Sequence, residues 1–215
     1  MELILGSESV FRKQLMDDAG LACKVLPANI DEKAIRDDDP NILVVKLGLA
    51  KNDKVSESFT RLDDVLVITS DQVLATPKKQ GWEILEKPLT EDGWPDRLLA
   101  RQYLLSYASK PFTAFTSLVV NCIRLGHRVS HIDKVQVYLS PFTDEEIEQI
   151  LSDPMTYKAA GAIATGIPDS IASRIIESHI TDIFGDKSGL IGLPMRQLKQ
   201  TLSVFGYGFS NKAKA

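Results

Sequence analysis

The stretch that most constrains the fold of this chain is residues 65–73, which read V-L-V-I-T-S-D-Q-V. The first four residues are β-branched or aliphatic, a pattern typical of a strand buried on both faces. Four polar residues follow, and one of them is Asp71. Because α/β enzymes often expose a catalytic group at the carboxyl end of a buried strand, we expect the strand to end here and to present Asp71. The structural alternative is that Asp71 merely opens a turn.

The rest of the chain predicts an α/β fold with a mixed sheet. Residues 112–123 and 128–139 alternate apolar and polar side chains and are joined by Leu125-Gly126-His127, which predicts an antiparallel hairpin. Helices before and after this hairpin exclude a plain doubly wound sheet. Further strands are expected at residues 2–5, 21–26, 82–85 and 174–179, and helices after Ser9, Asp39, residues 90–95, Thr143 and Pro194.

Composition limits the size and the location of the protein. The 215 residues suit one large domain or two closely joined lobes, and we assign residues 1–207 to one domain and 208–215 to a frayed tail. A net charge of −4 gives no general attraction to nucleic acid or to an anionic membrane, so any phosphate site must be a local basic cluster. The chain shows neither a signal peptide nor an apolar run of about 20 residues. We therefore expect a soluble, cytoplasmic protein without membrane or nucleic-acid partners.

Several charged side chains could complete a site around Asp71. The turn Gly6-Ser7-Glu8-Ser9 leads into a helix start with Arg12 nearby, so free amides, the helix dipole and a cation could converge on an anion. The same kind of turn also opens helices that bind nothing. Glu32, Lys51 and Lys87 are further candidates, although each is also compatible with a solvated surface charge.

Other chemistries find little support in the sequence. Cys23 and Cys122 form neither a disulfide framework nor a zinc site, and His127, His131 and His179 lack metal-ligand spacing. No nucleophile motif, P-loop or dinucleotide fingerprint is present.

Short motifs in a fixed order resemble the Maf family of nucleoside triphosphate pyrophosphatases, which is similar in fold to the inosine triphosphate pyrophosphatases. They are L-I-L-G-S-E-S-V-F-R (3–12), D-E-K-A-I-R (31–36), A-K (50–51), S-D-Q-V (70–73), E-K-P (86–88), A-G-A (160–162) and G-L-P (192–194). The resemblance runs from Leu3 to about Leu202. It implies an elongated mixed α/β fold, two lobes with a deep central cleft, and often a homodimer.

The resemblance also implies roles for single residues. The family loop S-x-S-P-R-R falls on residues 7–12, where Val10 and Phe11 replace the proline and the first arginine. The phosphate-binding positions that match are Ser7, Arg12, Lys51 and Lys87. The family's proton acceptor falls on Asp71. Glu32 and Asp71 are oxygen ligands suited to a divalent cofactor, Mg²⁺ or Mn²⁺.

Three motif positions are implicated in the choice of base, and here they fall on Phe11, Gln72 and roughly Thr165. Pyrimidine-specific members typically show arginine, threonine and glutamine, whereas a subgroup acting on 7-methyl-GTP shows an aromatic residue, glutamine and glutamate. Phe11 and Gln72 match the second pattern and Thr165 matches neither. An aromatic ring stacks well on a cationic methylated purine, and Gln72 offers a donor and an acceptor to a base edge. Our hypothesis is therefore 7-methyl-GTP in preference to dTTP or UTP, the alternative being that Phe11 is helix packing.

The leading interpretation is an enzyme that hydrolyses the α–β phosphoanhydride of a nucleotide, releasing a nucleoside monophosphate and pyrophosphate. One alternative is a non-catalytic nucleotide-binding protein in cell-division (septum formation) control, which would not need the complete set of acids and lysines. Another is a phosphatase acting on sugar phosphates. Product analysis separates the three, since they release pyrophosphate, nothing and orthophosphate respectively.

Overall fold

The structure is a computed structural model that describes residues 1–208, so the expected tail beyond Gly208 lies outside the described residues. The strands are β1 (Glu2–Leu5), β2 (Cys23–Val25), β3 (Val65–Pro77), β4 (Trp82–Leu85), β5 (Phe112–Cys122), β6 (His127–Leu139) and β7 (Ile180–Phe184). The α-helices are α1 (Val10–Asp18), α2 (Pro40–Ser56), α3 (Arg97–Ser106), α4 (Asp144–Ser152), α5 (Ile171–Ser178), α6 (Lys187–Leu190) and α7 (Met195–Val204). Three 3₁₀ turns complete the set: η1 (Glu32–Ala34), η2 (Pro154–Lys158) and η3 (Ala160–Ala162).

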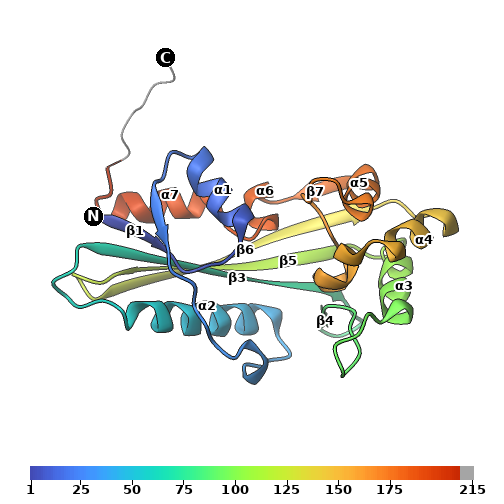
Figure 1. Ribbon diagram of the computed structural model, residues 1–215, viewed down its shortest axis with the longest axis horizontal. Helices are drawn as coiled ribbons and strands as arrows, with labels where there is room; N and C mark the ends of the chain where they lie inside the picture. The colour runs from blue at the N-terminus through green and yellow to red at the C-terminus, as the bar shows by residue number, and fades with distance from the viewer. Residues whose placement is uncertain (209–215) are drawn as a thin grey trace, which may run out of the picture.

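All seven strands belong to one elongated sheet with the order β2-β1-β3-β5-β6-β7, and β4 pairs with β3 off this path (Figure 1). β1 is parallel to β2 and to β3, whereas the pairs β3–β5, β5–β6 and β6–β7 are antiparallel. The predicted mixed sheet and the predicted hairpin of β5 and β6 are therefore confirmed.

One edge of β3 is shared by two short strands that leave its middle uncovered. β1 pairs with β3 only as far as Leu5 beside Ile68, and β4 pairs with it only from Leu85 beside Leu74 onward. Within residues 1–208, no strand pairs with this edge between those two points. The result is a gap in the sheet next to residues 69–73.

The expectation that the central strand ends at its polar residues is wrong. β3 continues to Pro77, because Val73, Leu74 and Ala75 are buried, β5 pairs with the opposite edge as far as Ala75, and β4 pairs with the last residues. Asp71 therefore lies in the middle of a strand. The strand edge beside it is uncovered because β1 and β4 stop short of it, although the Asp71 side chain itself is only 11% exposed.

Helices cover both faces of the sheet (Figure 1). Successive side chains of a strand point to opposite faces, so β1 contributes Ile4 to a core with Val55 of α2, and Leu5 to a core with Met16 of α1 and Leu198 of α7. At the other end of the sheet, α3, α4 and α5 enclose a third core around Phe112. None of the helices described in residues 1–208 is both long and apolar enough to cross a membrane.

The strand predicted at residues 174–179 is instead helical, since residues 174–178 belong to α5 and His179 is its C-cap. Ala172 and Ile176 are buried four residues apart, and the Ser170 side chain caps the helix by accepting from the Ser173 amide at 3.0 Å. A spacing of four is a helical period. The helix predicted after Thr143 is confirmed as α4, and it begins with a capping box formed by Thr143 and Glu146.

Candidate active site

The uncovered middle of β3 is completed by side chains instead of a strand. The Ser70 carbonyl accepts from Nη1 of Arg12 at 2.7 Å, and the Gln72 amide donates to Oδ1 of Asp71 at 2.7 Å. Backbone groups that would otherwise be unpaired are thus satisfied locally. Since strand side chains alternate, Asp71 and Gln72 point to opposite faces of the sheet.

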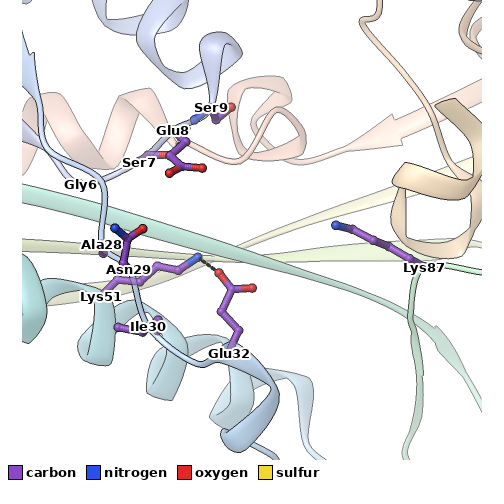
Figure 2. A pocket seen from close by; sticks show the side chains of 10 residues that line it. All are labelled: Gly6, Ser7, Glu8, Ser9, Ala28, Asn29, Ile30, Glu32, Lys51 and Lys87. Atoms are coloured by element: carbon purple, nitrogen blue, oxygen red, sulfur yellow. Dashed lines mark hydrogen bonds and ion pairs between the residues drawn. The ribbon is translucent and has the colours of Figure 1, made fainter. Parts of the chain in front are cut away.

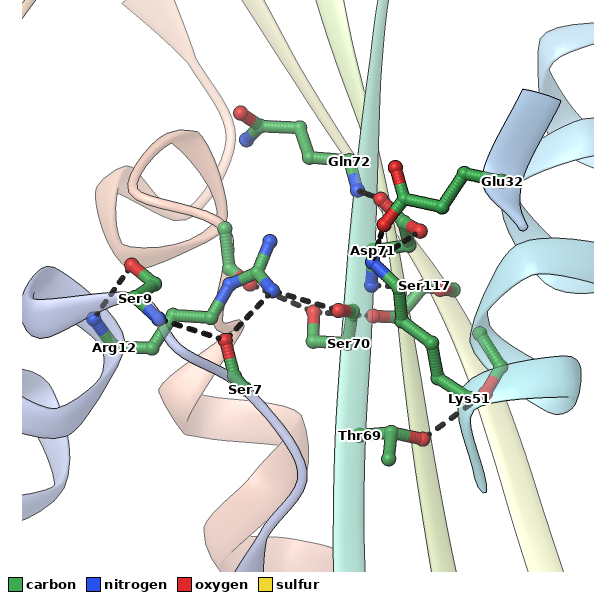
Figure 3. A network of polar contacts seen from close by, with 12 residues as sticks. Ser7, Ser9, Arg12, Glu32, Lys51, Thr69, Ser70, Asp71, Gln72 and Ser117 are labelled. Carbon is green, nitrogen blue, oxygen red and sulfur yellow. Dashed lines mark hydrogen bonds and ion pairs between the residues drawn. The ribbon is translucent and has the colours of Figure 1, made fainter. Parts of the chain in front are cut away.

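On one face, Lys51 connects two carboxylates. Its Nζ lies 2.8 Å from Oδ2 of Asp71 and 2.7 Å from Oε1 of Glu32 (Figure 3). The Lys51 and Asp71 side chains are only 13% and 11% exposed, whereas Glu32 is 56% exposed. Two acids therefore share one largely buried cation.

Close packing of α2 on the sheet sets the position of Lys51. A Cβ on Gly48 would lie 2.4 Å from the Ser117 hydroxyl, so only glycine permits this approach. Thr69 donates to the Gly48 carbonyl at 3.0 Å, and Ser117 accepts from the Asp71 amide at 3.2 Å. One turn of helix beyond Gly48, Lys51 reaches the open edge of β3.

The turn between β1 and α1 lies beside this ion-pair cluster. The Ser7 hydroxyl accepts from the Ser9 amide at 3.2 Å and from Nη1 of Arg12 at 3.2 Å, and Ser9 caps α1 as predicted. Burial lowers the pKa of Arg12, while the charges of Asp71 and Glu32 act to raise that pKa. An arginine keeps its charge under such conditions, so Arg12 braces the turn and carries positive charge behind it.

A cavity of about 500 Å³ unites most of the predicted phosphate-binding residues (Figure 2). It is lined by Gly6, Ser7, Glu8, Ser9, Ala28, Asn29, Ile30, Glu32, Lys51 and Lys87. Lys87 extends toward it from the side opposite Lys51 and makes no ion pair with any described residue. We call this space the phosphate cavity. Glu8 and Asn29 also line this cavity and are not among the residues predicted from the sequence, where only the position of Glu8 in the turn indicates such a place.

A second cavity, of about 430 Å³, lies next to Gln72 and brings together the three predicted base-selecting residues. Phe11, Gln72 and Thr165 line it together with mostly aliphatic side chains from residues 159–191. Phe11 is 40% exposed, so it is not a core residue of the helix. We call this space the base cavity, and its role in base selection stays a prediction.

Gln72 enters the base cavity with its amide nitrogen already occupied. Nε2 donates to the carbonyls of Gly189 and Leu190, each at 2.9 Å, and lies 3.2 Å from the Thr116 hydroxyl. Two carbonyl acceptors fix which end of the amide is nitrogen. The expectation that Gln72 offers both a donor and an acceptor is therefore wrong, because only its oxygen is available to a ligand.

Two carboxylates of the site, those of Glu32 and Asp71, could bind a divalent cation together. No group of three His, Cys, Asp or Glu residues in the described part of the chain could hold a metal ion. Glu32 and Asp71 nevertheless both contact Lys51, which places two hard oxygen donors close together. Mg²⁺ commonly takes one or two carboxylates and completes its shell with water and substrate phosphates, and this pair suits that pattern.

Two of the histidines make contacts away from both cavities. His179 contacts Glu146 at 3.1 Å and Ser140 at 2.8 Å, and His131 contacts Thr201 at 3.0 Å. Cys23 and Cys122 are free thiols.

Known proteins resemble this chain over almost its whole length. A 7-methyl-GTP pyrophosphatase from Dictyostelium discoideum is 31% identical over 94% of this chain and 95% of its own. A nucleoside triphosphate pyrophosphatase from Synechococcus is 28% identical over 97% and 96%, and a dTTP/UTP pyrophosphatase from Agathobacter rectalis is 28% identical over 95% and 98%. A solved dITP/XTP pyrophosphatase from Mycobacterium abscessus covers 65% of this chain and 73% of its own at 8% identity and a TM-score of 0.41, a likeness too weak to carry an inference. Residues 2–205 match the family described as Maf-like protein, and the chain therefore belongs to that family.

Proposed function

We propose that this protein is a nucleoside triphosphate pyrophosphatase that hydrolyses the α–β phosphoanhydride and releases a nucleoside monophosphate and pyrophosphate. The observation that carries the proposal is the ion-paired Lys51 between Glu32 and Asp71. Lys51 and Glu32 line a polar cavity, and Gln72, the residue after Asp71, lines a largely apolar one. The relatives named as pyrophosphatases support the same reaction class.

The positively charged side chains of the phosphate cavity would neutralise the charge of the triphosphate. Lys51 and Lys87 supply two ammonium groups, and the start of α1 supplies backbone amides near Ser9. Arg12 acts through Ser7, which it holds in place, and adds long-range positive charge. Such fixed charges stabilise the charge that builds up on a phosphate during hydrolysis.

Asp71 is the proposed proton acceptor for the attacking water. Its Oδ1 accepts from the Gln72 amide and its Oδ2 contacts Lys51, so the carboxylate is held in one orientation. Glu32 and Asp71 would hold a divalent cation, Mg²⁺ or Mn²⁺, which polarises phosphate oxygens when bound. Exhaustive chelation is expected to abolish activity and added Mg²⁺ to restore it. Undiminished activity after chelation would remove the metal from the proposal.

For the base, we propose 7-methyl-GTP in preference to dTTP or UTP. The exposed ring of Phe11 can stack on a cationic purine, and the oxygen of Gln72 can accept from a base N–H. The Thr165 position provides no glutamate to balance the positive charge. The homodimer and the cytoplasmic location expected from the sequence stay predictions.

The decisive experiment is a pyrophosphate-release screen across natural and modified nucleoside triphosphates, with Asp71→Asn as the inactive control. Release of pyrophosphate, most rapid from 7-methyl-GTP, is the expected result. A clear preference for dTTP or UTP would refute the base assignment. Orthophosphate as the first product would indicate the sugar-phosphatase alternative, and nucleotide binding without any product would indicate the non-catalytic one.

A further inference from the structure

The base cavity contains a carboxylate that no sequence motif indicated. Glu177 of α5 lines it, and Oε1 of this side chain accepts from the Gly166 amide at 2.6 Å and from the Ser173 hydroxyl at 2.7 Å. Within residues 1–208, no donor is recorded for its Oε2. Glu177 is exposed, so this second oxygen is available to a ligand.

Hydrogen bonds hold Glu177 to the segment that includes Thr165. The Gly166 amide binds its Oε1, and Ser173 also accepts from the Ile167 amide at 3.1 Å. A side chain fixed by bonds at one oxygen loses less conformational entropy when its other oxygen binds a ligand. Glu177 is thus pre-organised at the edge of the cavity.

Four polar side chains line the cavity, and two of them, Gln72 and Glu177, present acceptors to a base edge; the other two are Thr165 and Lys187. Gln72 presents its oxygen because its nitrogen is bound to Gly189 and Leu190, and Glu177 presents Oε2. Acceptors pair only with donors, and an acceptor placed against an acceptor leaves both groups unsatisfied. Guanine carries a ring N–H next to an exocyclic amine, whereas adenine and cytosine carry a ring-nitrogen acceptor at the corresponding position.

We infer that Glu177 determines specificity by accepting hydrogen bonds from the edge of a guanine-type base, and that its charge favours a base with a positively charged ring. This inference rests on the proposed function. Glu177 would supply, from α5, the carboxylate that is missing at Thr165. Both acceptors and the aromatic ring of Phe11 already line the same cavity, so one base could contact all three.

Lys187 is the other charged residue of the lining, and its removal should change the preference for a cationic base in the opposite direction to the removal of Glu177. With Glu177 and Lys187 both present, the formal charges of the lining cancel. Loss of the carboxylate alone leaves a cation that repels a cationic base. Loss of Lys187 alone leaves an anion that attracts one.

The test compares pyrophosphate release from 7-methyl-GTP, GTP and UTP by Glu177→Gln, Lys187→Gln and wild type. Glutamine keeps an oxygen for the Gly166 amide while removing the charge, so the loop should stay in place. A bidentate contact to a base discriminates by about 1–3 kcal/mol, or roughly 5- to 150-fold. We expect Glu177→Gln to raise KM for 7-methyl-GTP at least about tenfold, with a smaller change in kcat, and to lower its preference over GTP. Lys187→Gln should raise that preference.

Asp182→Asn is the matched control, because Asp182 is an exposed carboxylate on β7 that does not line the cavity. It should leave KM and kcat for all three substrates unchanged. An equal loss for every substrate in Glu177→Gln would show a merely structural role and overturn the inference, as would unchanged preferences. If wild type releases pyrophosphate from no triphosphate, the proposed function itself fails, which is a different outcome.

Discussion

The phosphate cavity and the base cavity lie at the same gap in the sheet but are built in different ways. The phosphate cavity is lined largely by polar and charged side chains, of which Lys51 is fixed by ion pairs and Ser7 by a hydrogen bond to nearby backbone. The base cavity is mostly aliphatic, and its walls come largely from residues 159–191. Under the proposed function, catalysis would therefore depend on a few charged side chains, whereas base selectivity would depend on the packing of residues 159–191.

Of the substitutions considered, Asp71→Asn should have the largest effect on the catalytic rate. Loss of a general base lowers kcat by about 10²- to 10⁴-fold, and the same residue is the proposed metal ligand. Asparagine keeps an oxygen for the Gln72 amide, so binding in the base cavity should survive. Single-turnover pyrophosphate release together with nucleotide titration measures both properties. A rate close to that of wild type would remove Asp71 from the mechanism.

Lys51→Ala and Lys87→Ala should both weaken catalysis but should differ in stability. Lys51 is largely buried between two acids, and removing one partner of a buried ion pair costs about 3–5 kcal/mol of folding free energy. Lys87 is exposed and makes no ion pair with a described residue, so its loss should leave the unfolding free energy within about 0.5 kcal/mol.

Urea unfolding and steady-state kinetics of the two variants provide the measurement. Kinetics unaffected in both would mean that the triphosphate lies elsewhere. If Lys51→Ala and Lys87→Ala lowered the free energy of unfolding equally, the contrast between the buried, ion-paired Lys51 and the exposed Lys87 would be contradicted.

Phe11→Ala should affect the base cavity alone. Stacking of a base on an aromatic ring contributes about 1–3 kcal/mol, so nucleotide affinity should fall by roughly that amount. Val10→Ala is the control, since Val10 is its neighbour, is 76% exposed and does not line either of the two cavities. Calorimetric titration with 7-methyl-GTP measures the change. Equal effects of the two variants would mean that Phe11 does not contact the base.

Asp133→Asn, on β6 and outside both cavities, should have the smallest effect. Asp133 is buried, its Oδ1 accepts from Gln197 at 2.8 Å, and burial raises the pKa of its carboxyl above the usual 3.8. A raised pKa in the folded state means that stability is present at low pH and is lost as pH rises through the folded-state pKa.

The neutral asparagine avoids that loss. The melting temperature of Asp133→Asn should therefore exceed that of wild type at pH 7, and the difference should shrink toward pH 4. Thermal unfolding at both values measures it. A variant that is less stable at pH 7 would show that the carboxylate has a favourable partner.

The sequence predicted what short-range rules determine. The β5–β6 hairpin, the caps at Ser9 and Thr143 and the mixed sheet followed from alternation and capping chemistry. The gap beside Asp71 did not, because it depends on where two other strands stop pairing with β3.

The base cavity was the least predictable part of the site. Residues 174–179 were predicted as a strand, and that error hid the position of Glu177 on α5. Nothing in the sequence indicates that Gly189 and Leu190 occupy the nitrogen of Gln72, since this contact joins residues more than a hundred positions apart. The hydrophobic periodicity of a sequence does not reveal tertiary contacts of this kind.

One nucleotide is proposed to place its phosphates in the phosphate cavity and its base in the base cavity. Calorimetric binding of 7-methyl-GTP and of inorganic tripolyphosphate to the Asp71→Asn protein, with and without Phe11→Ala, tests this placement most directly. Phe11→Ala should weaken binding of the nucleotide about tenfold and leave binding of tripolyphosphate unchanged. Equal weakening of both ligands, or of neither, would contradict this placement.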